Sequence, residues 1–352
     1  MNPFTTSMVR TSLPIIPLFS LFAGAAGCLT DEELETSEVE LEATVYAWSE
    51  DAPIGTSLET WPRSDYQVGL ATLNDRVAMV YTGKDYLLYS ASYGRTPFAD
   101  RGGLFAIEGW SSAVKLPFST RAGSGPALVN HGGQLVLVYH PRFENRLMMA
   151  TSPNGADWTA PVTAGSTLGG AGILEAPAAV SHRGTLYIGY CTRTSAGDRV
   201  RIDRLDGASW TKLAELPVTN YRCAHVALAS LPDGKLDILA NVENASTGTY
   251  STFEWAGFGT PASTWLRYTL GMKSKKPISI ATCGGITHLV HGGHSTPNEI
   301  WWTVREGGYW LYDTRIPDQV SDGGASLACF GTDTIMVHNG SYDFLWWARY
   351  SE

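Results

Sequence analysis

The chain has 352 residues, of which 44% are hydrophobic, and it contains 37 Gly, 16 Tyr and 12 Trp. This composition is typical of a folded, turn-rich protein and excludes extensive disorder. The net charge of -9 argues against a nucleic-acid partner, because contacts to phosphates need a basic face.

Residues 1–27 have the order of a secretory signal peptide. A polar start that contains Arg is followed by an apolar stretch from Leu13 to Ala23 and by small residues up to Gly27. The apolar stretch is too short to span a bilayer stably. The segment before Cys28 resembles the lipobox of bacterial lipoproteins, and this resemblance implies that the Cys28 thiol is lipidated. An ordinary signal peptide with an incidental Cys is the alternative.

Residues 28–44 predict an acidic, flexible tether. Between Asp31 and Glu42 there are seven carboxylates and no basic residue, which favours an extended, self-repelling segment. Leu29 rather than Asp follows Cys28, and in the lipoproteins that it resembles this favours the outer membrane. We therefore predict that the protein is held in the cell envelope by a lipid anchor alone, or that it is secreted.

One pattern recurs along the rest of the chain with a period of about fifty residues, as repeat proteins show. It consists of an acidic or amide residue, Gly, two variable residues and Trp, as in NGADW, DGASW and EGGYW. Six tryptophans align on this period: Trp61, Trp110, Trp158, Trp210, Trp265 and Trp310. Each unit also has two strand-like runs joined by a Gly, Asn or Asp turn, which predicts hairpins over 66–82, 125–140, 176–191, 223–241, 276–292 and 324–339.

A third strand and a Trp-containing fourth strand follow each hairpin, which is the organisation of a propeller blade. The last unit ends after its third strand, DFLWWARYS. We therefore predict an all-β fold for residues 45–352: a six-bladed β-propeller of four-stranded antiparallel blades. An N-terminal strand is expected to complete the last blade.

The repeat resembles that of the sialidase-like, or Asp-box, β-propellers and of the propeller lectins. SPNGADW, residues 152–158, is the nearest copy of the Asp-box, although it is one residue shorter. The short form is more similar to that of the lectins. The resemblance implies that Gly turns a hairpin, that the acid or amide caps it and that Trp packs between blades.

Four cysteines remain beyond Cys28, an even number in an exported chain, which predicts two disulfides. Cys191 and Cys223 fall on one face of the predicted ring, and Cys283 and Cys329 on the other, so we expect these two pairs. Free buried thiols are the alternative. Without a close C-x-x-C pair we predict no metal site and no cofactor.

A candidate site follows from aligning the ends of the second strands and the starts of the first strands on one face. This alignment predicts an axial rim of rings, amides and charges, which suits sugar binding. The first-strand entries expected on this rim are Arg63, Asp65, Arg121, Glu175, Tyr221, Arg222, Lys275 and Lys276. The predicted ligand-binding residues are Tyr81, Tyr139, His140, Tyr190, Tyr221, Arg222, His291 and His338.

The favoured function is a tethered propeller that binds an extracellular glycan or polysaccharide at its axial face without catalysis, as a monomer. A polysaccharide lyase is a second hypothesis, because Tyr or His can act as base and a cation can neutralise a uronate. Its candidate catalytic residues are His140, Tyr190, Arg222 and His291. A sialidase-like glycoside hydrolase and a protein-interaction platform in the envelope are two further hypotheses.

Overall fold

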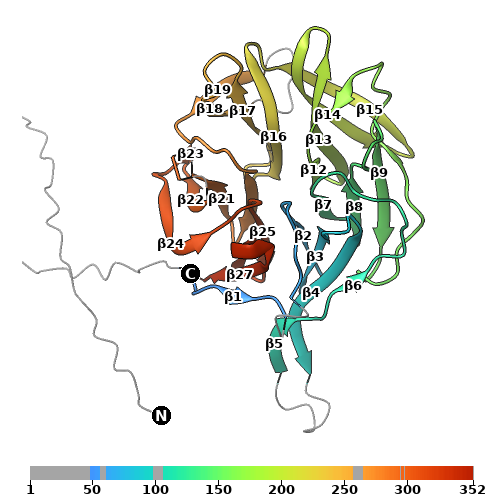
Figure 1. Cartoon of the computed structure of the whole chain (residues 1–352), viewed down its shortest axis with the longest axis vertical. Helices are drawn as coiled ribbons and strands as arrows, with labels where there is room; N and C mark the ends of the chain where they lie inside the picture. Colours follow the sequence, from blue (N-terminus) through green and yellow to red (C-terminus); the bar gives the residue numbers. More distant parts are fainter. Residues whose placement is uncertain are drawn as a thin grey trace, which may run out of the picture. The chain divides into compact units, whose positions relative to one another are not determined.

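The computed structural model describes residues 48–55, 61–97, 106–256, 265–293, 295–296 and 298–351. These residues form a ring of six antiparallel sheets, which is the predicted six-bladed β-propeller (Figure 1). The predicted signal peptide, the acidic tether and Cys28 lie outside the described residues.

Each blade is a meander of antiparallel strands that begins at the centre of the ring. The first blade contains β2 (Gly69–Leu73), β3 (Arg76–Thr82), β4 (Leu88–Pro97) and β5 (Ala106–Trp110). The second contains β7 (Ala127–His131), β8 (Gln134–Tyr139), β9 (Leu147–Ser152) and β10 (Val162–Ala164). The third contains β12 (Ala178–His182), β13 (Thr185–Thr194), β14 (Gly197–Asp206) and β15 (Ser209–Pro217).

The other half of the ring repeats this organisation. The fourth blade contains β16 (Tyr221–Ser230), β17 (Leu236–Asn244), β18 (Tyr250–Ala256) and β19 (Leu266–Leu270). The fifth contains β20 (Ser279–Cys283), β21 (Ile286–Gly292), β22 (Glu299–Glu306), β23 (Tyr309–Trp310) and β24 (Thr314–Val320). The sixth contains β25 (Ala325–Phe330), β26 (Asp333–Asn339), η3 (Ser341–Asp343), β27 (Leu345–Tyr350) and β1 (Ala52–Pro53). Two short strands, β6 (Val114–Lys115) and β11 (Gly172–Ile173), extend the first and third blades.

The N-terminal strand closes the ring as predicted. Ala52 of β1 lies opposite Trp347 of β27, and Pro53 lies opposite Trp346. Without β1 the third strand of the last blade would be an open sheet edge, which proteins normally cover. The innermost strands β2, β7, β12, β16, β20 and β25 contact one another in this order, and β25 returns to β2.

The hydrophobic core lies between blades rather than at the centre of the ring. Each pair of neighbouring blades shares one cluster of buried apolar side chains. The repeated tryptophans are partly buried against these clusters, each on the side of the preceding blade: Trp110, Trp158, Trp210, Trp265 and Trp310. In the sixth blade this position is taken by Trp48, not Trp61, which instead contacts Phe344 and Trp346.

Both predicted disulfides are present. Cys191–Cys223 joins β13 to β16, and Cys283–Cys329 joins β20 to β25. Disulfides persist in oxidising compartments, so the two bonds indicate an extracellular or envelope protein. Among the described residues there is no helix long and apolar enough to cross a membrane.

Candidate functional site

The predicted rim of second-strand side chains is not formed. Tyr81, Tyr139, Tyr190, His291 and His338 are at most 4% exposed and lie inside or between blades. Each blade packs against a neighbour on both faces, so a residue on a second strand is buried whichever way it points. These five side chains are therefore corrected to core positions.

Four of these five side chains make polar or ring contacts within their blades. Tyr190 donates a hydrogen bond of 2.7 Å to Asp203, and Tyr81 stacks on Tyr89 with centroids 5.5 Å apart. His291 Nε2 lies 3.1 Å from Asp313, and His338 Nε2 lies 3.0 Å from Asp51.

The other three predicted residues do lie on the axial face. Arg222 is exposed, while His140 and Tyr221 are partly buried. His140 Nε2 contacts the Glu144 carbonyl at 2.6 Å, within its own loop. Since Tyr190 and His291 are buried in different blades, the structure does not bring together the four residues suggested for a lyase.

The axial channel itself is too narrow for a ligand. It has a volume of about 100 Å³ and is lined mainly by apolar side chains of the six first strands. Ligand pockets usually have about 300 to 1,000 Å³. At the start of β2, Gln67 Nε2 donates to the carbonyls of Ala325, at 2.6 Å, and Ile278, at 3.3 Å, and so spans the channel. A ligand on the axis would therefore bind above the channel.

Six polar side chains surround this point, on the face where second strands end and first strands begin. We call this group the axial mouth. Its members come from the second and fourth blades and from the segments that lead into the first and third: Tyr66, Arg142, Glu175, Arg222, Glu243 and Tyr250.

Glu175 is the central group of the axial mouth. The surrounding protein partly desolvates its carboxyl and raises its pKa, although the side chain reaches solvent. Burial also raises the pKa of the Tyr66 hydroxyl. The charge of Glu175 raises this pKa further, whereas that of Arg142 lowers it. Glu175 therefore lies within electrostatic reach of a phenol from the first blade.

A second carboxylate of the axial mouth has a different environment. Glu243, at the end of β17, forms an ion pair with Arg222, whose Nη1 lies 3.9 Å from it. Burial raises the pKa of Tyr250, and the charges that act on it are Glu243, Arg222 and Glu175. The axial mouth thus contains one partly desolvated carboxyl and one paired with a cation, and both act on Tyr250.

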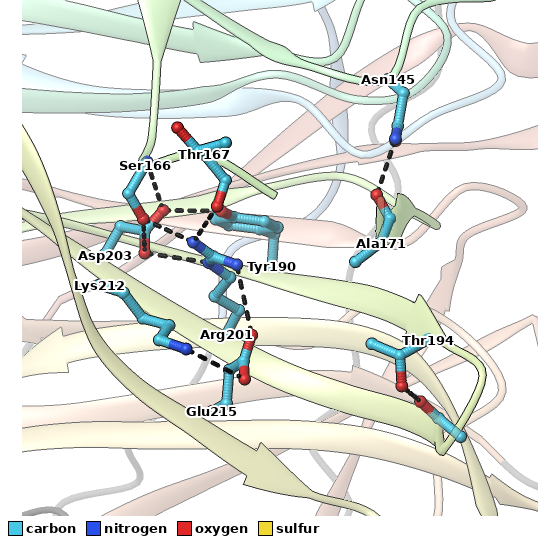
Figure 2. Close-up of polar contacts among 11 residues, drawn as sticks. Asn145, Ser166, Thr167, Ala171, Tyr190, Thr194, Arg201, Asp203, Lys212 and Glu215 are labelled. Atoms are coloured by element: carbon cyan, nitrogen blue, oxygen red, sulfur yellow. Dashed lines mark hydrogen bonds and ion pairs between the residues drawn. The ribbon is translucent and has the colours of Figure 1, made fainter. Parts of the chain in front are cut away.

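Buried polar contacts hold the long connection that carries Glu175, between β10 and β12. Figure 2 shows Arg201 and Asp203 at one end of this connection. Ser166 donates to Asp203 from its backbone N and from Oγ, both at 2.8 Å, and Arg201 donates to the Thr167 carbonyl at 2.9 Å. Both side chains of the ion pair are at most 4% exposed.

Further along, the same connection is fixed next to Glu175. Asn145 donates to the Ala171 carbonyl at 2.7 Å and accepts from the Ile173 N at 2.9 Å (Figure 2 shows the first contact). The Leu174 N donates to the carbonyl of Cys191, a residue of the first disulfide, at 3.1 Å. The position of Glu175 therefore depends on contacts from the second and third blades.

Between blades, away from the axis, described residues line three larger cavities. A cavity of about 580 Å³ lies between the first and second blades, one of about 440 Å³ between the third and fourth, and one of about 620 Å³ between the fifth and sixth. Each contains an Arg and at least one Trp, but the other side chains differ between the three. Among the described residues no group of three or more His, Cys, Asp or Glu side chains is placed to hold a metal ion.

No protein-family model matches this sequence, and a comparison with curated proteins finds no match either. Solved structures do match. A protein of unknown function from Dyadobacter fermentans has a TM-score of 0.64 at 11% identity, over 86% of this chain and 98% of that one. The alpha-L-arabinanase of Penicillium chrysogenum, complexed with arabinobiose, has a TM-score of 0.61 at 13% identity, over 86% and 98%.

The sialidase of Trypanosoma rangeli has a TM-score of 0.53 at 12% identity, over 82% of this chain and 55% of that one. The chain has a sialidase-like β-propeller fold. At such low identity these likenesses show the fold alone, and the function has to be argued from the axial mouth.

Proposed function

We propose that the protein binds a glycan at its axial mouth, outside the cytoplasm. The observation that supports this most directly is the group of Glu175, Tyr66 and Tyr250 above the narrow axial channel. Carboxylates and phenols hydrogen-bond to sugar hydroxyls, while the ring faces pack on C–H groups. Two structural neighbours, an arabinanase and a sialidase, are glycan-active proteins by name, which is consistent with this proposal.

Hydrolysis of a glycosidic bond is the second candidate, and the difference between the two carboxyls favours it. A carboxyl with a raised pKa can donate a proton to a leaving oxygen, and an ionised partner can activate water or stabilise positive charge on the sugar. Desolvation of Glu175 suits the first role. Pairing of Glu243 with Arg222 suits the second.

A glycan array with the mature chain tests binding, and analysis of the bound glycans for released sugars tests hydrolysis. Glu175→Gln and Tyr66→Phe should each lower affinity, whereas Tyr268→Phe, on the outer strand β19, should not. Glycan binding without released sugars would indicate a lectin. Product whose rate falls as pH rises through the pKa of Glu175 would indicate a hydrolase. Equal binding by all variants would contradict the axial site.

The sequence further supports a lipid anchor at Cys28 and a location in the envelope, with the outer membrane favoured. Mass spectrometry of the mature N-terminus tests this directly. A diacylglyceryl adduct on Cys28 is expected, and an unmodified N-terminus elsewhere would contradict the anchor. No nucleic-acid partner is proposed, and a monomer is expected by light scattering.

A further inference from the structure

Three aromatic residues on the axial face have unusual backbone conformations. Tyr86, Phe143 and Tyr342 have φ values of 66°, 68° and 62°, in the left-handed region that bulky residues rarely adopt. Each lies between the second and third strands of its blade, in the first, second and sixth blades. Phe143 is 90% exposed and Tyr342 is 82% exposed. Because this backbone is unfavourable and the exposed rings add little to the core, a role in ligand contact is indicated.

The three segments are connected to one another. The Ala122 N donates to the Tyr86 carbonyl at 2.8 Å, and the Arg142 N donates to the Arg121 carbonyl at 2.7 Å. These bonds tie the loops of the first and second blades to the segment between them. We call the surface of Tyr86, Phe143 and Tyr342, with the arginines among them, the aromatic rim.

An ion pair links the sixth blade to the same surface. Lys84 Nζ lies 2.5 Å from Asp343, the residue after Tyr342, and Lys84 also pairs with Asp65. Tyr86 and Arg142 both act on the pKa of Tyr66 in the axial mouth. The aromatic rim is therefore continuous with the axial mouth and extends from it over three blades.

The charge of the aromatic rim comes from arginines without acidic partners. The Arg142 guanidinium carbon lies 3.7 Å from the Tyr86 ring centroid and 4.7 Å from that of Phe143. Rings that flank a guanidinium leave its N–H edge available, and this edge matches a carboxylate or sulfate. Within the described part of the chain, Arg142 makes no ion pair or side-chain hydrogen bond.

Two more arginines extend this pattern. Arg63 is exposed, and its guanidinium carbon lies 4.3 Å from the Phe344 ring centroid. Arg121 is exposed beside Arg142. Neither forms an ion pair with another described residue. A chain with a net charge of -9 thus has three arginines without ion-pair partners among the described residues, on the aromatic rim and the segments beside it.

We propose that the aromatic rim binds an extended acidic polysaccharide whose end lies in the axial mouth. This rests on the proposed function. Sugar rings of the ligand stack on Phe143 and Tyr342, and an acidic group of the ligand binds the N–H edge of Arg142. The rim adds affinity only for ligands long enough to leave the mouth.

Calorimetric titration with acidic oligosaccharides of two, four and six sugars tests this inference. The probes are oligogalacturonates, alginate and hyaluronan oligomers, with neutral cello-oligosaccharides for comparison. Affinity for at least one acidic series should rise with length. Phe143→Ala should lower the affinity for the hexamer of that series about three- to tenfold and leave the affinity for the dimer unchanged. Arg142→Gln should weaken binding of both, because Arg142 also belongs to the axial mouth.

Tyr312→Ala is the matched control, because Tyr312 is 97% exposed but lies on the outer side of the fifth blade, between β23 and β24. It should bind every oligomer as the unchanged protein does. An equal gain with length for neutral oligomers, a hexamer affinity unaffected by Phe143→Ala, or no binding of any acidic oligomer would each overturn the inference. The proposed function would still stand if neutral glycans bound and Glu175→Gln abolished that binding.

Discussion

Replacing Asp203 by Asn should destabilise the propeller far more than the same change at Asp206. Both residues are on β14, and each pairs with an Arg two positions earlier. Asp203 is fully buried and accepts four hydrogen bonds, from Tyr190, from Arg201 and two from Ser166. An Asn amide group must face at least one of these donors, and the buried Arg201 keeps only the partly exposed Glu215, at 3.3 Å, as an acidic partner.

Loss of one partner of a buried ion pair costs about 3 to 5 kcal/mol. For a propeller of about 300 residues this corresponds to a fall in Tm of about 5 to 8 °C. The pair of Asp206 with Arg204 is about two-fifths exposed on both sides, so solvent screens it and its loss should cost far less than that of the buried pair. Scanning calorimetry compares the variants. Equal shifts in Tm for Asp203→Asn and Asp206→Asn would refute the reasoning.

Three further predictions concern the core and the electrostatics. Replacing Cys191 and Cys223 by Ser opens a link between residues 32 apart and should cost about 4 kcal/mol, measured as a lower Tm in oxidising buffer. Tyr139→Phe should leave glycan affinity unchanged in titrations, because the side chain is fully buried. Arg305→Gln should lower the free energy of unfolding in urea more at pH 8 than at pH 5. Burial raises the pKa of Asp237, and the positive charge of Arg305 opposes this rise. Without Arg305 the ionised Asp237 carboxylate is less stable in the folded protein, so the loss of stability grows as the pH rises and this carboxyl ionises.

Much of the fold could be predicted because a propeller repeats one unit. All six hairpins were expected from the turns and the alternating runs, and β2 with β3 and β7 with β8 lie within the expected ranges. The Asp-box turn has its expected form. Gly155 has a φ of +82°, and the Asn154 side chain accepts bonds from the Ala156 and Asp157 backbone. Such local chemistry is visible in the sequence because it involves neighbouring residues.

The exception in the fold has a physical reason. The spacing of the tryptophans places Trp61 in the sixth repeat, whereas Trp48 fills that position between the fifth and sixth blades. The N-terminal strand is separated in sequence from the blade that it completes, so the regular spacing does not extend to it.

The candidate site was harder to predict because alignment selects positions that all blades share. Such positions build the common scaffold, and this is why Tyr139, Tyr190 and His291 are in the core. Glu175 lies near the end of a long connection, and Phe143 lies in a loop with a left-handed backbone. Glu175 was nevertheless among the first-strand entries expected on the rim, whereas Phe143 has aromatic counterparts, Tyr86 and Tyr342, in only two other blades.

Function in a ring of similar blades therefore depends on residues that depart from the repeat. The departures here share one face: the connection that carries Glu175, the loop with Phe143 and Arg142, and the ion pair of Arg222 with Glu243. A departure that serves folding alone could occur on either face with equal cost. Their concentration around the channel is expected if one asymmetric ligand binds across several blades. Such a ligand needs different side chains from each blade, although the blades have the same fold.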